Sequence, residues 1–296
     1  MDEIAAIDKA ALRRAFNRAA GSYDAAAQLQ REVADRMLER LDYVRLQPAT
    51  VLDVGAGTGY CMRHLRTRYP AARIYALDIA ERMLRQARAG LSWWQRWRRC
   101  SAFMVGDAEA LPLREASVDL IVSNLTVQWC PSLAQTFAEF RRVLRPDGLL
   151  MFTTFGPDTL QELRAAWAQV DTHVHVNSFL DMHDVGDALM QAGFADPVMD
   201  VEHFNVTYAD VKSLMHDLKA IGAHNVNHAR HHGITGKRRL AAMIDAYEMF
   251  RHEGRIPATH EVVYGHAWAG SAAAATPGSI SIALDDVGNI SRQRKG

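Results

Sequence analysis

The sequence lacks several features, and each absence excludes a class of protein. No apolar run approaches the ~20 residues that a membrane-spanning helix needs. The first residues, MDEIAAIDKA, contain acids and have neither the basic region nor the apolar region of a secretory signal. The three cysteines, Cys61, Cys100 and Cys130, lie far apart without a CxxC pair, which argues against a disulfide framework and a zinc cage. We therefore expect a cytoplasmic protein.

A net charge of either sign is also lacking. Lys+Arg and Asp+Glu both number 34, so no overall field attracts the chain to nucleic acid or to a membrane. The 13 histidines are numerous and would make the chain positive as the pH falls towards ~6.5. A length of 296 residues fits one domain with an elaborated cap.

Hydrophobic periodicity predicts an α/β fold. Residues 8–45 have helical spacing, interrupted by Gly21 and Ser22, so we expect two helices with a kink around Tyr23. From 50 to 155, short apolar strands alternate with amphipathic helices, which indicates a doubly wound, mostly parallel sheet with helices on both faces. The last of these helices is expected to stop at Arg145-Pro146-Asp147-Gly148, a turn that begins the next strand.

The second half shows weaker patterns. Its Ala/Ser/Gly-rich end is typical of a disordered tail. The expected elements are helices at 159–171, 182–193, 209–221 and 237–252, and strands at 197–208 and 260–268.

The stretch TVLDVGAGTGY, residues 50–60, predicts a buried strand, a glycine turn and the start of a helix. A dinucleotide fingerprint, G-x-G-x-x-G, would need a third glycine where Tyr60 stands. Asp53 precedes the turn, and a carboxylate suits a cationic ligand better than a pyrophosphate. S-adenosylmethionine (SAM) carries an amino group and a sulfonium and has no phosphate. Gly55, Gly57 and Gly59 would then allow close backbone approach.

Polar residues also end the next three predicted strands. Asp78 ends RIYALD, where it can accept both ribose hydroxyls, and Asp107 in VGDAEALPL can meet the adenine edge. Asn124 ends VDLIVSN, beside the methyl-donor end. Single acids after strands often only cap helices. Four such residues at successive strand ends, where ligands bind in this fold, favour SAM binding.

These motifs resemble those of a known family. VLDVGAGTGY, ALDIAERML, GDAEALPL and LRPDG resemble the motif series of class I SAM-dependent methyltransferases. The segments FNRAAGSYDAAAQLQREVADRML, SNLTVQWC, LKAIGAHNVNHAR and RIPATHEVVYGHAW are similar to those of malonyl-acyl-carrier-protein O-methyltransferases, which open pimelate assembly for biotin. The likeness covers about residues 8–268. It implies a seven-stranded Rossmann-like core, a helical lid at each end of the chain, SAM as methyl donor and malonyl-acyl-carrier protein as substrate, with malonyl-coenzyme A as another possible handle.

The resemblance also implies boundaries and roles. We expect an N-terminal lid at 1–45, a SAM-binding core at 46–208, a substrate lid at 209–258, a final core strand at 259–269 and a tail at 270–296. Arg230 is the candidate for the substrate carboxylate, Tyr23 for closure over the methyl-donor end, and Gln128, with Trp129, for the pocket floor. The candidate cofactor-binding residues are Asp53, Gly55, Ala56, Gly57, Gly59, Asp78, Ile79, Asp107, Ala108 and Asn124.

Other interpretations concern metal, partner and function. His224, His228, His231 and His232 share one loop, but no thiol or acidic pattern completes a metal shell, and the resemblance implies no metal. An acidic carrier protein would need a basic docking patch. WWQRWRRC at 93–100 and GKRRL at 236–240 are candidates, and we favour GKRRL; a Trp/Arg run also suits nucleic acid stacking.

Three alternatives to the carboxyl methyltransferase stay open. One is a methyltransferase for another protein or small molecule, such as the related assembly factors of respiratory complex I. Another is a scaffold that binds a partner without catalysis. The third, an NAD oxidoreductase, is disfavoured by Tyr60 and Asp53.

Overall fold

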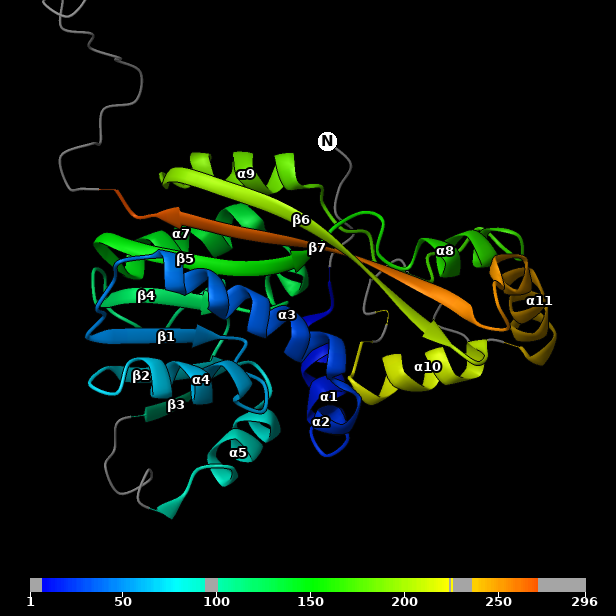
Figure 1. Ribbon diagram of the computed structural model, residues 1–296, viewed down its shortest axis with the longest axis horizontal. Coiled ribbons are helices and arrows are strands. Elements are labelled where there is room, and N and C mark those ends of the chain that lie inside the picture. Colours follow the sequence, from blue (N-terminus) through cyan, green and yellow to red (C-terminus); the bar gives the residue numbers. More distant parts are fainter. Residues whose placement is uncertain (1–6, 94–100, 224, 226–235, 271–296) are drawn as a thin grey trace, which may run out of the picture.

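The computed structural model describes residues 7–93, 101–223, 225 and 236–270. It contains a seven-stranded sheet in the order β3-β2-β1-β4-β5-β7-β6 (Figure 1). The first five strands of this order pair in parallel, and β7 pairs antiparallel to both β5 and β6. The strands are β1 (Thr50–Val54), β2 (Arg73–Asp78), β3 (Ser101–Val105), β4 (Val118–Ser123), β5 (Leu144–Phe155), β6 (Ala195–Tyr208) and β7 (Ile256–Trp268). The predicted fold class is confirmed.

Helices cover both faces of the sheet and extend one end of it. They are α1 (Lys9–Ala19), α2 (Tyr23–Ala26), α3 (Gln28–Glu39), α4 (Tyr60–Arg68), α5 (Glu81–Ala89), α7 (Leu133–Val143), α8 (Gln161–Ala168), α9 (Met182–Gln191), α10 (Val211–Ala220) and α11 (Lys237–Tyr247). Short 3-10 turns occupy Arg40–Tyr43, Val127–Trp129 and Glu248–Phe250. Within the described part of the chain, none of these helices combines the length and the apolarity that crossing a bilayer requires.

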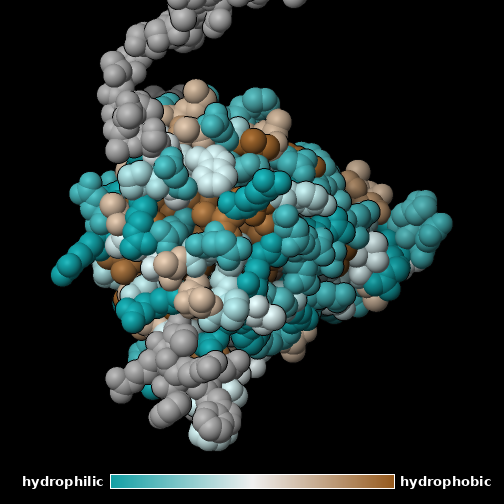
Figure 2. Space-filling model, turned by 60° about the vertical axis from the view of Figure 1, so that its left-hand side comes forward, coloured by the Kyte–Doolittle hydropathy of each residue, from teal (hydrophilic) through white to brown (hydrophobic). Residues whose placement is uncertain are grey.

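Two layers of core flank the sheet. On one face, Val33 and Met37 of α3 and Leu65 of α4 pack against the strands. On the other, Phe137 and Phe140 of α7 pack with α9. The strands of the parallel part are therefore buried on both faces, as doubly wound sheets require. The face drawn in Figure 2 is mostly hydrophilic, and hydrophobic residues show mainly in recesses between polar side chains.

The N-terminal helices depart in detail from the sequence prediction. The kink around Tyr23 is confirmed, because α1 ends at Ala19 and the separate four-residue helix α2 begins at Tyr23. The Asp8 carboxylate caps α1 by accepting from the Ala11 N–H at 2.8 Å. These helices lie over the carboxyl ends of β1 and β4 (Figure 1).

The Arg145–Gly148 turn was placed wrongly. Helix α7 ends at Val143, and β5 begins at Leu144, so the proline-glycine segment forms an irregularity within the strand. The pairing register with β4 shifts there, and Asp147 has φ 59°. A bulge accommodates the extra residues without ending the pairing.

The long strands β6 and β7 extend past the rest of the sheet and support a second group of helices, α8, α10 and α11 (Figure 1). Trp167, Leu214 and Tyr247 pack there around Ile256 at the start of β7. Helices α10 and α11 lie in the segment 209–258 for which a substrate lid was expected. The division of the chain into lids and core stays a prediction.

Candidate active site

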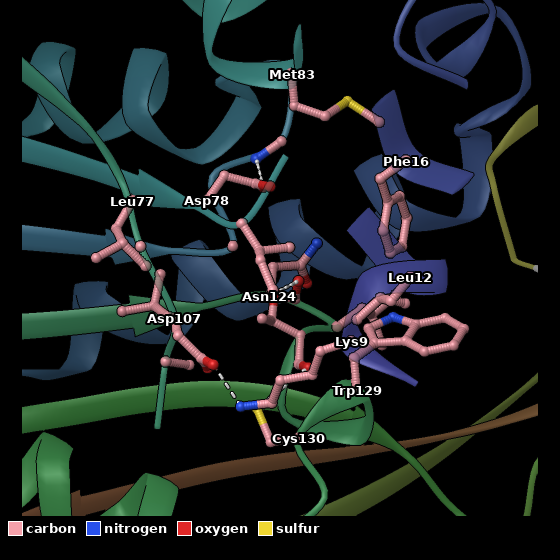
Figure 3. A pocket seen from close by; sticks show the side chains of 18 of the residues that line it. Lys9, Leu12, Phe16, Leu77, Asp78, Met83, Asp107, Asn124, Trp129 and Cys130 are labelled. Carbon is pink, nitrogen blue, oxygen red and sulfur yellow. Dashed lines mark hydrogen bonds and ion pairs between the residues drawn. The ribbon is translucent and has the colours of Figure 1, made fainter. Parts of the chain in front are cut away.

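A cavity of about 90 Å³ lies at the carboxyl ends of the parallel strands, the position where ligands bind in open α/β sheets. Figure 3 shows Asp78, Asp107 and Asn124 from the strand ends facing the same space as Lys9, Leu12 and Phe16 of α1. Its lining comprises Lys9, Leu12, Phe16, Tyr23, Val54, Gly55, Gly57, Leu77, Asp78, Ile79, Met83, Gly106, Asp107, Ala108, Asn124, Leu125, Thr126, Trp129 and Cys130.

Each glycine of the turn after β1 has its own structural reason. All three have positive φ, 71° at Gly55, 53° at Gly57 and 84° at Gly59. A Cβ on Gly55 would stand 1.9 Å from Thr126 Oγ1, and a Cβ on Gly59 would stand 2.9 Å from the Ala87 Cβ. A Cβ on Gly57 would meet nothing nearer than the Gly55 carbonyl at 4.0 Å. Gly57 therefore leaves its backbone open to the cavity.

Asp78, the last residue of β2, ties that turn to its own strand. One carboxylate oxygen accepts from the Gly57 N–H at 2.9 Å, and the other accepts from the Ala80 N–H at 2.7 Å. Burial raises the pKa of Asp78 to about 6, although both of these backbone hydrogen bonds act in the opposite direction. A buried carboxylate with lone pairs directed at a cavity is suited to bind hydroxyl donors of a ligand.

Asp107 lies two residues past β3 and is joined to the N-terminal helix. The Lys9 ammonium of α1 forms ion pairs with Asp107 and Glu109. Burial alone would lower the pKa of Lys9, but the hydrogen bonds that its ammonium donates to the two carboxylates, together with their charge, outweigh burial and raise that pKa. This contact holds α1 over the cavity.

Asn124 joins α3 to the end of β4. Its amide N–H donates to the Gln30 carbonyl at 3.0 Å, and its Oδ1 accepts from the Thr153 hydroxyl at 2.8 Å. The Thr153 hydroxyl in turn accepts from the Leu125 N–H at 2.9 Å. Because both ends of the amide are engaged, Asn124 has a fixed orientation at the cavity wall.

Further polar contacts connect the N-terminal helices to the glycine turn. The Thr58 hydroxyl donates to Asp24 at 2.6 Å, and the Tyr60 hydroxyl donates to Asp35 at 2.9 Å. Tyr60, which distinguishes this turn from a dinucleotide fingerprint, thus anchors α3. The α1–α3 segment therefore contacts the turn through several hydrogen bonds as well as through apolar packing.

Aromatic side chains form the remaining wall. Phe16 and Trp129 meet edge to face with ring centroids 5.6 Å apart, and Phe16 and Tyr23 pack against Met83. Burial, reinforced by the nearby Asp78 carboxylate, raises the pKa of Tyr23 well above its usual value. Tyr23 is therefore a protonated hydroxyl at neutral pH.

Several predicted site residues do not line this cavity. Asp53, Ala56 and Gly59 are not part of its lining, and Gln128 lines a separate pocket of about 30 Å³ with Phe155 and Phe179. Burial raises the pKa of Asp53 to about 7. Its Oδ2 is buried and, among the described residues, has no hydrogen-bond partner. Such an atom calls for a donor from outside the chain.

Other predictions fall wholly or partly outside the described residues. These are Arg230, the four histidines of the loop, the tail from 271 and all but the first residue of WWQRWRRC. GKRRL is described: its residues 236–239 are exposed at the start of α11, and Arg239 lies 3.9 Å from Asp171. Figure 1 shows α11 at the far end of the paired strands β6 and β7, away from the ends of β1 and β4.

Lys9, Thr126 and Cys130 were not predicted as lining residues. Leu12 and Phe16, which also line it, fall within the predicted helical segment 8–45. No local pattern distinguishes Lys9, because its partner Asp107 lies 98 residues away in the chain. Burial raises the pKa of Cys130 to about 12, so it lines the cavity as a neutral thiol.

The lining fits the cofactor expected from the sequence. Lys9 is the one Lys or Arg among the described lining residues, and it is already paired with two carboxylates, so a pyrophosphate would find little counter-charge. Asp78 offers carboxylate oxygens for hydroxyl donors, Gly57 offers close approach, and Leu12, Phe16 and Met83 supply apolar surface. These features suit a nucleoside with a sulfonium better than a phosphate-bearing nucleotide.

Comparison with known proteins also indicates a methyltransferase domain. Residues 52–152 match the family model described as a methyltransferase domain. The chain resembles the solved structure of the YcgJ protein from Bacillus subtilis, with a TM-score of 0.54 and 14% identity over 78% of this chain and 97% of that one, which supports the shared fold.

The sequence relatives are much more similar. The chain is 55% identical to the malonyl-[acyl-carrier protein] O-methyltransferase of Gallionella capsiferriformans (strain ES-2), covering 88% of this chain and 91% of the relative. It is also 55% identical to the protein of that name from Methylovorus sp. (strain MP688), covering 93% and 94%. This chain therefore belongs to the malonyl-[acyl-carrier protein] O-methyltransferase family.

Proposed function

We propose that this chain transfers the methyl group of SAM to the free carboxylate of malonyl-acyl-carrier protein, the esterification that opens pimelate assembly. The observation that carries the proposal is the extent of the similarity. The methyltransferase-domain match ends at residue 152, whereas the relatives named for this substrate remain 55% identical over about nine-tenths of the chain. The likeness therefore includes the N-terminal helices and the segment around β6 and β7, which the general domain does not contain.

We assign the cofactor contacts to residues at the strand ends. Asp78 would accept the ribose hydroxyls, Asp107 would lie at the adenine edge, and the backbone around Gly55 and Gly57 would approach the methionine half. The partnerless Oδ2 of Asp53, which does not line the cavity, would receive the amino group through water. When bound, SAM supplies a methyl group made electrophilic by the sulfonium.

The protein's own part is to exclude water and orient the acceptor. A malonyl carboxylate is ionised at neutral pH and needs no general base. Because opposite charges disperse as the carboxylate meets the sulfonium, a water-poor site lowers the barrier. Phe16 and Trp129 provide such a wall. Tyr23, which lines the cavity as a protonated hydroxyl, would donate to one carboxylate oxygen and leave the other free to attack.

Arg230 remains our candidate for the charged contact to the substrate. The described residues before it support this position: a Cβ on Gly222 would come within 3.2 Å of Phe16, a residue of the cavity wall. The chain at Gly222, eight residues before Arg230, thus lies beside the cavity. Gln128 lines the smaller pocket instead of the cofactor cavity, so its role at the floor stays a prediction. We also propose a cytoplasmic location, since Cys61 and Cys130 are buried free thiols.

The test is to incubate the protein with methyl-labelled SAM and with malonyl-, succinyl- and acetyl-loaded carrier protein. We expect a labelled methyl ester with the malonyl form, little with succinyl and none with acetyl, which has no free carboxylate. Label on the acetyl form would refute carboxyl methylation. Label on malonyl-coenzyme A at the same rate would show that the carrier protein is not the preferred handle.

A further inference from the structure

A second, larger hollow lies beside the cofactor cavity. It has a volume of about 620 Å³ and lies between three parts of the chain: the N-terminal helices α2 and α3, strand β6 and helix α10. We call it the lateral groove. Its lining comprises Ser22, Ala25, Ala26, Gln28, Leu29, Gln30, Glu32, Arg36, Phe204, Val206, Tyr208, His216, Asp217, Leu218, Ala220, Ile221 and His260. None of these residues lines the cofactor cavity.

The two hollows share a thin wall. Tyr23, the first residue of α2, lines the cofactor cavity, while Ala25 and Ala26 of the same four-residue helix line the lateral groove. The hydrogen bond from Asn124 to the Gln30 carbonyl joins a residue of one lining to a residue of the other. A ligand lying along the groove therefore has one end at the place where Tyr23 and Asn124 border the cofactor cavity.

The groove offers apolar surface and neutral hydrogen-bond acceptors. Leu29, Val206 and Ile221 are examples of its apolar lining. His260 is buried, and burial lowers its pKa to about 4, so it is neutral. Its Nδ1 lies 3.0 Å from the Ala258 carbonyl and donates to it, which leaves Nε2 as an acceptor. Gln30 Oε1 is buried and has no hydrogen-bond partner among the described residues.

The cationic side chain of Arg36 in this lining already forms ion pairs with carboxylates of the protein. Arg36 pairs with Glu32 at 2.9 Å and with Glu202 at 2.6 Å, and its guanidinium lies 4.8 Å over the Phe204 ring. A carboxylate or phosphate would find no unpaired Lys or Arg in the described lining. The lining instead matches a long, uncharged chain that carries N–H and O–H donors and aliphatic groups.

We propose that the lateral groove binds the pantetheine arm of the malonyl thioester and delivers its malonyl end to the wall formed by Tyr23 and Asn124. This inference rests on the proposed function. A pantetheine arm has two amide N–H groups, a hydroxyl and a dimethyl-substituted carbon, and carries no charge along its length. The amide and hydroxyl donors match the acceptors on His260 and Gln30, and the aliphatic part matches the apolar lining.

The test uses two neighbouring residues of β6. Side chains of consecutive strand residues point to opposite faces, and here Val206 lines the groove while Asn205 is exposed on the other face. We expect Val206→Trp to lower kcat/KM for malonyl-pantetheine about tenfold or more by filling the groove, with SAM affinity measured by calorimetry unchanged. The matched control Asn205→Trp should leave both quantities within about twofold. Equal kcat/KM for the two variants at unchanged SAM affinity would overturn the proposal.

A series of handles tests the groove without any substitution. The wild-type protein should have a KM about tenfold lower for malonyl-pantetheine than for the malonyl methyl thioester, which lacks the arm. Equal KM values would overturn the groove assignment, even if both substrates are esterified. If the protein esterifies none of the three substrates, malonyl-pantetheine, the malonyl methyl thioester and malonyl-carrier protein, the proposed function itself is refuted. If Val206→Trp loses SAM binding through a folding defect, the handle series decides alone.

Discussion

Asp78 is buried, yet both of its carboxylate oxygens accept backbone hydrogen bonds at the edge of the cofactor cavity. The raised pKa, about 6, means that the ligand-free protein begins to protonate this group in mildly acidic solution. Ribose hydroxyls donate to the ionised form and would bind the protonated form less well. The residue therefore couples cofactor binding to pH.

This coupling gives the first prediction. Because binding favours the ionised group, protonation of Asp78 should lower SAM affinity by about tenfold per pH unit below pH 6, in addition to any loss that begins near pH 7 as Asp53 is protonated. Asp78→Asn should weaken binding by roughly 10- to 100-fold, since each hydrogen bond to a charged group contributes about 1.5–3 kcal/mol. The variant should also lose the dependence between pH 5 and 6. Calorimetric titrations across this range measure both effects, and a variant with wild-type affinity would contradict the assignment of Asp78.

The glycines of the turn give the second prediction, in the free energy of unfolding. Gly55→Ala combines a positive φ with a Cβ that would overlap Thr126, so we expect a loss of about 3 kcal/mol or more. Gly57→Ala meets open space and should lose only about 1–2 kcal/mol from its backbone conformation. In SAM binding, Gly57→Ala should still be strongly affected, because its methyl group enters the cavity. Urea unfolding monitored by circular dichroism would refute this ranking if Gly57→Ala proved the less stable variant.

At the scale of elements, helix α1 closes the cofactor cavity through the ion pairs of Lys9 with Asp107 and Glu109. Lys9→Met should release this end of the helix and speed SAM dissociation by about two- to fivefold, since partly exposed ion pairs contribute about 1 kcal/mol or less. Arg13→Met, at an exposed position of the same helix, is the control. Stopped-flow measurement of dissociation distinguishes them. Identical rates for the two variants would show that the ion pairs do not hold the helix.

The sequence predicted the elements with strong local signals. Strands β1 and β2 match the predicted residues, and the kink at Tyr23 follows from Gly21 and Ser22. The strand-end positions of Asp78, Asp107 and Asn124 were also predictable, because parallel strands bring their carboxyl ends to one edge. Lys9 and the lateral groove were not, since both depend on contacts between segments far apart in the chain. Likewise, Gln128 follows Asn124 closely, but the 3-10 turn at Val127–Trp129 directs it to another pocket.

At the scale of the whole molecule, the cofactor cavity lies between the N-terminal helices and the sheet, so SAM should stabilise both together. At a SAM concentration 100 times its dissociation constant, the expected gain is about 2.7 kcal/mol. For a chain of this size that corresponds to an increase in Tm of about 5–10 °C. Differential scanning calorimetry measures it, with Asp78→Asn at the same SAM concentration as the control. An unchanged Tm for the wild type would contradict a site closed by these helices.

The account depends on one central claim, that the acidic residues at the strand ends hold the nucleoside of SAM beneath the N-terminal helices. A crystal structure of the complex with S-adenosylhomocysteine tests it most directly. We predict both ribose hydroxyls within hydrogen-bonding distance of the Asp78 carboxylate and the sulfur on the side of the cavity bordered by Tyr23 and Asn124. A nucleoside bound elsewhere, or an Asp78 side chain turned away from the ribose, would contradict the claim.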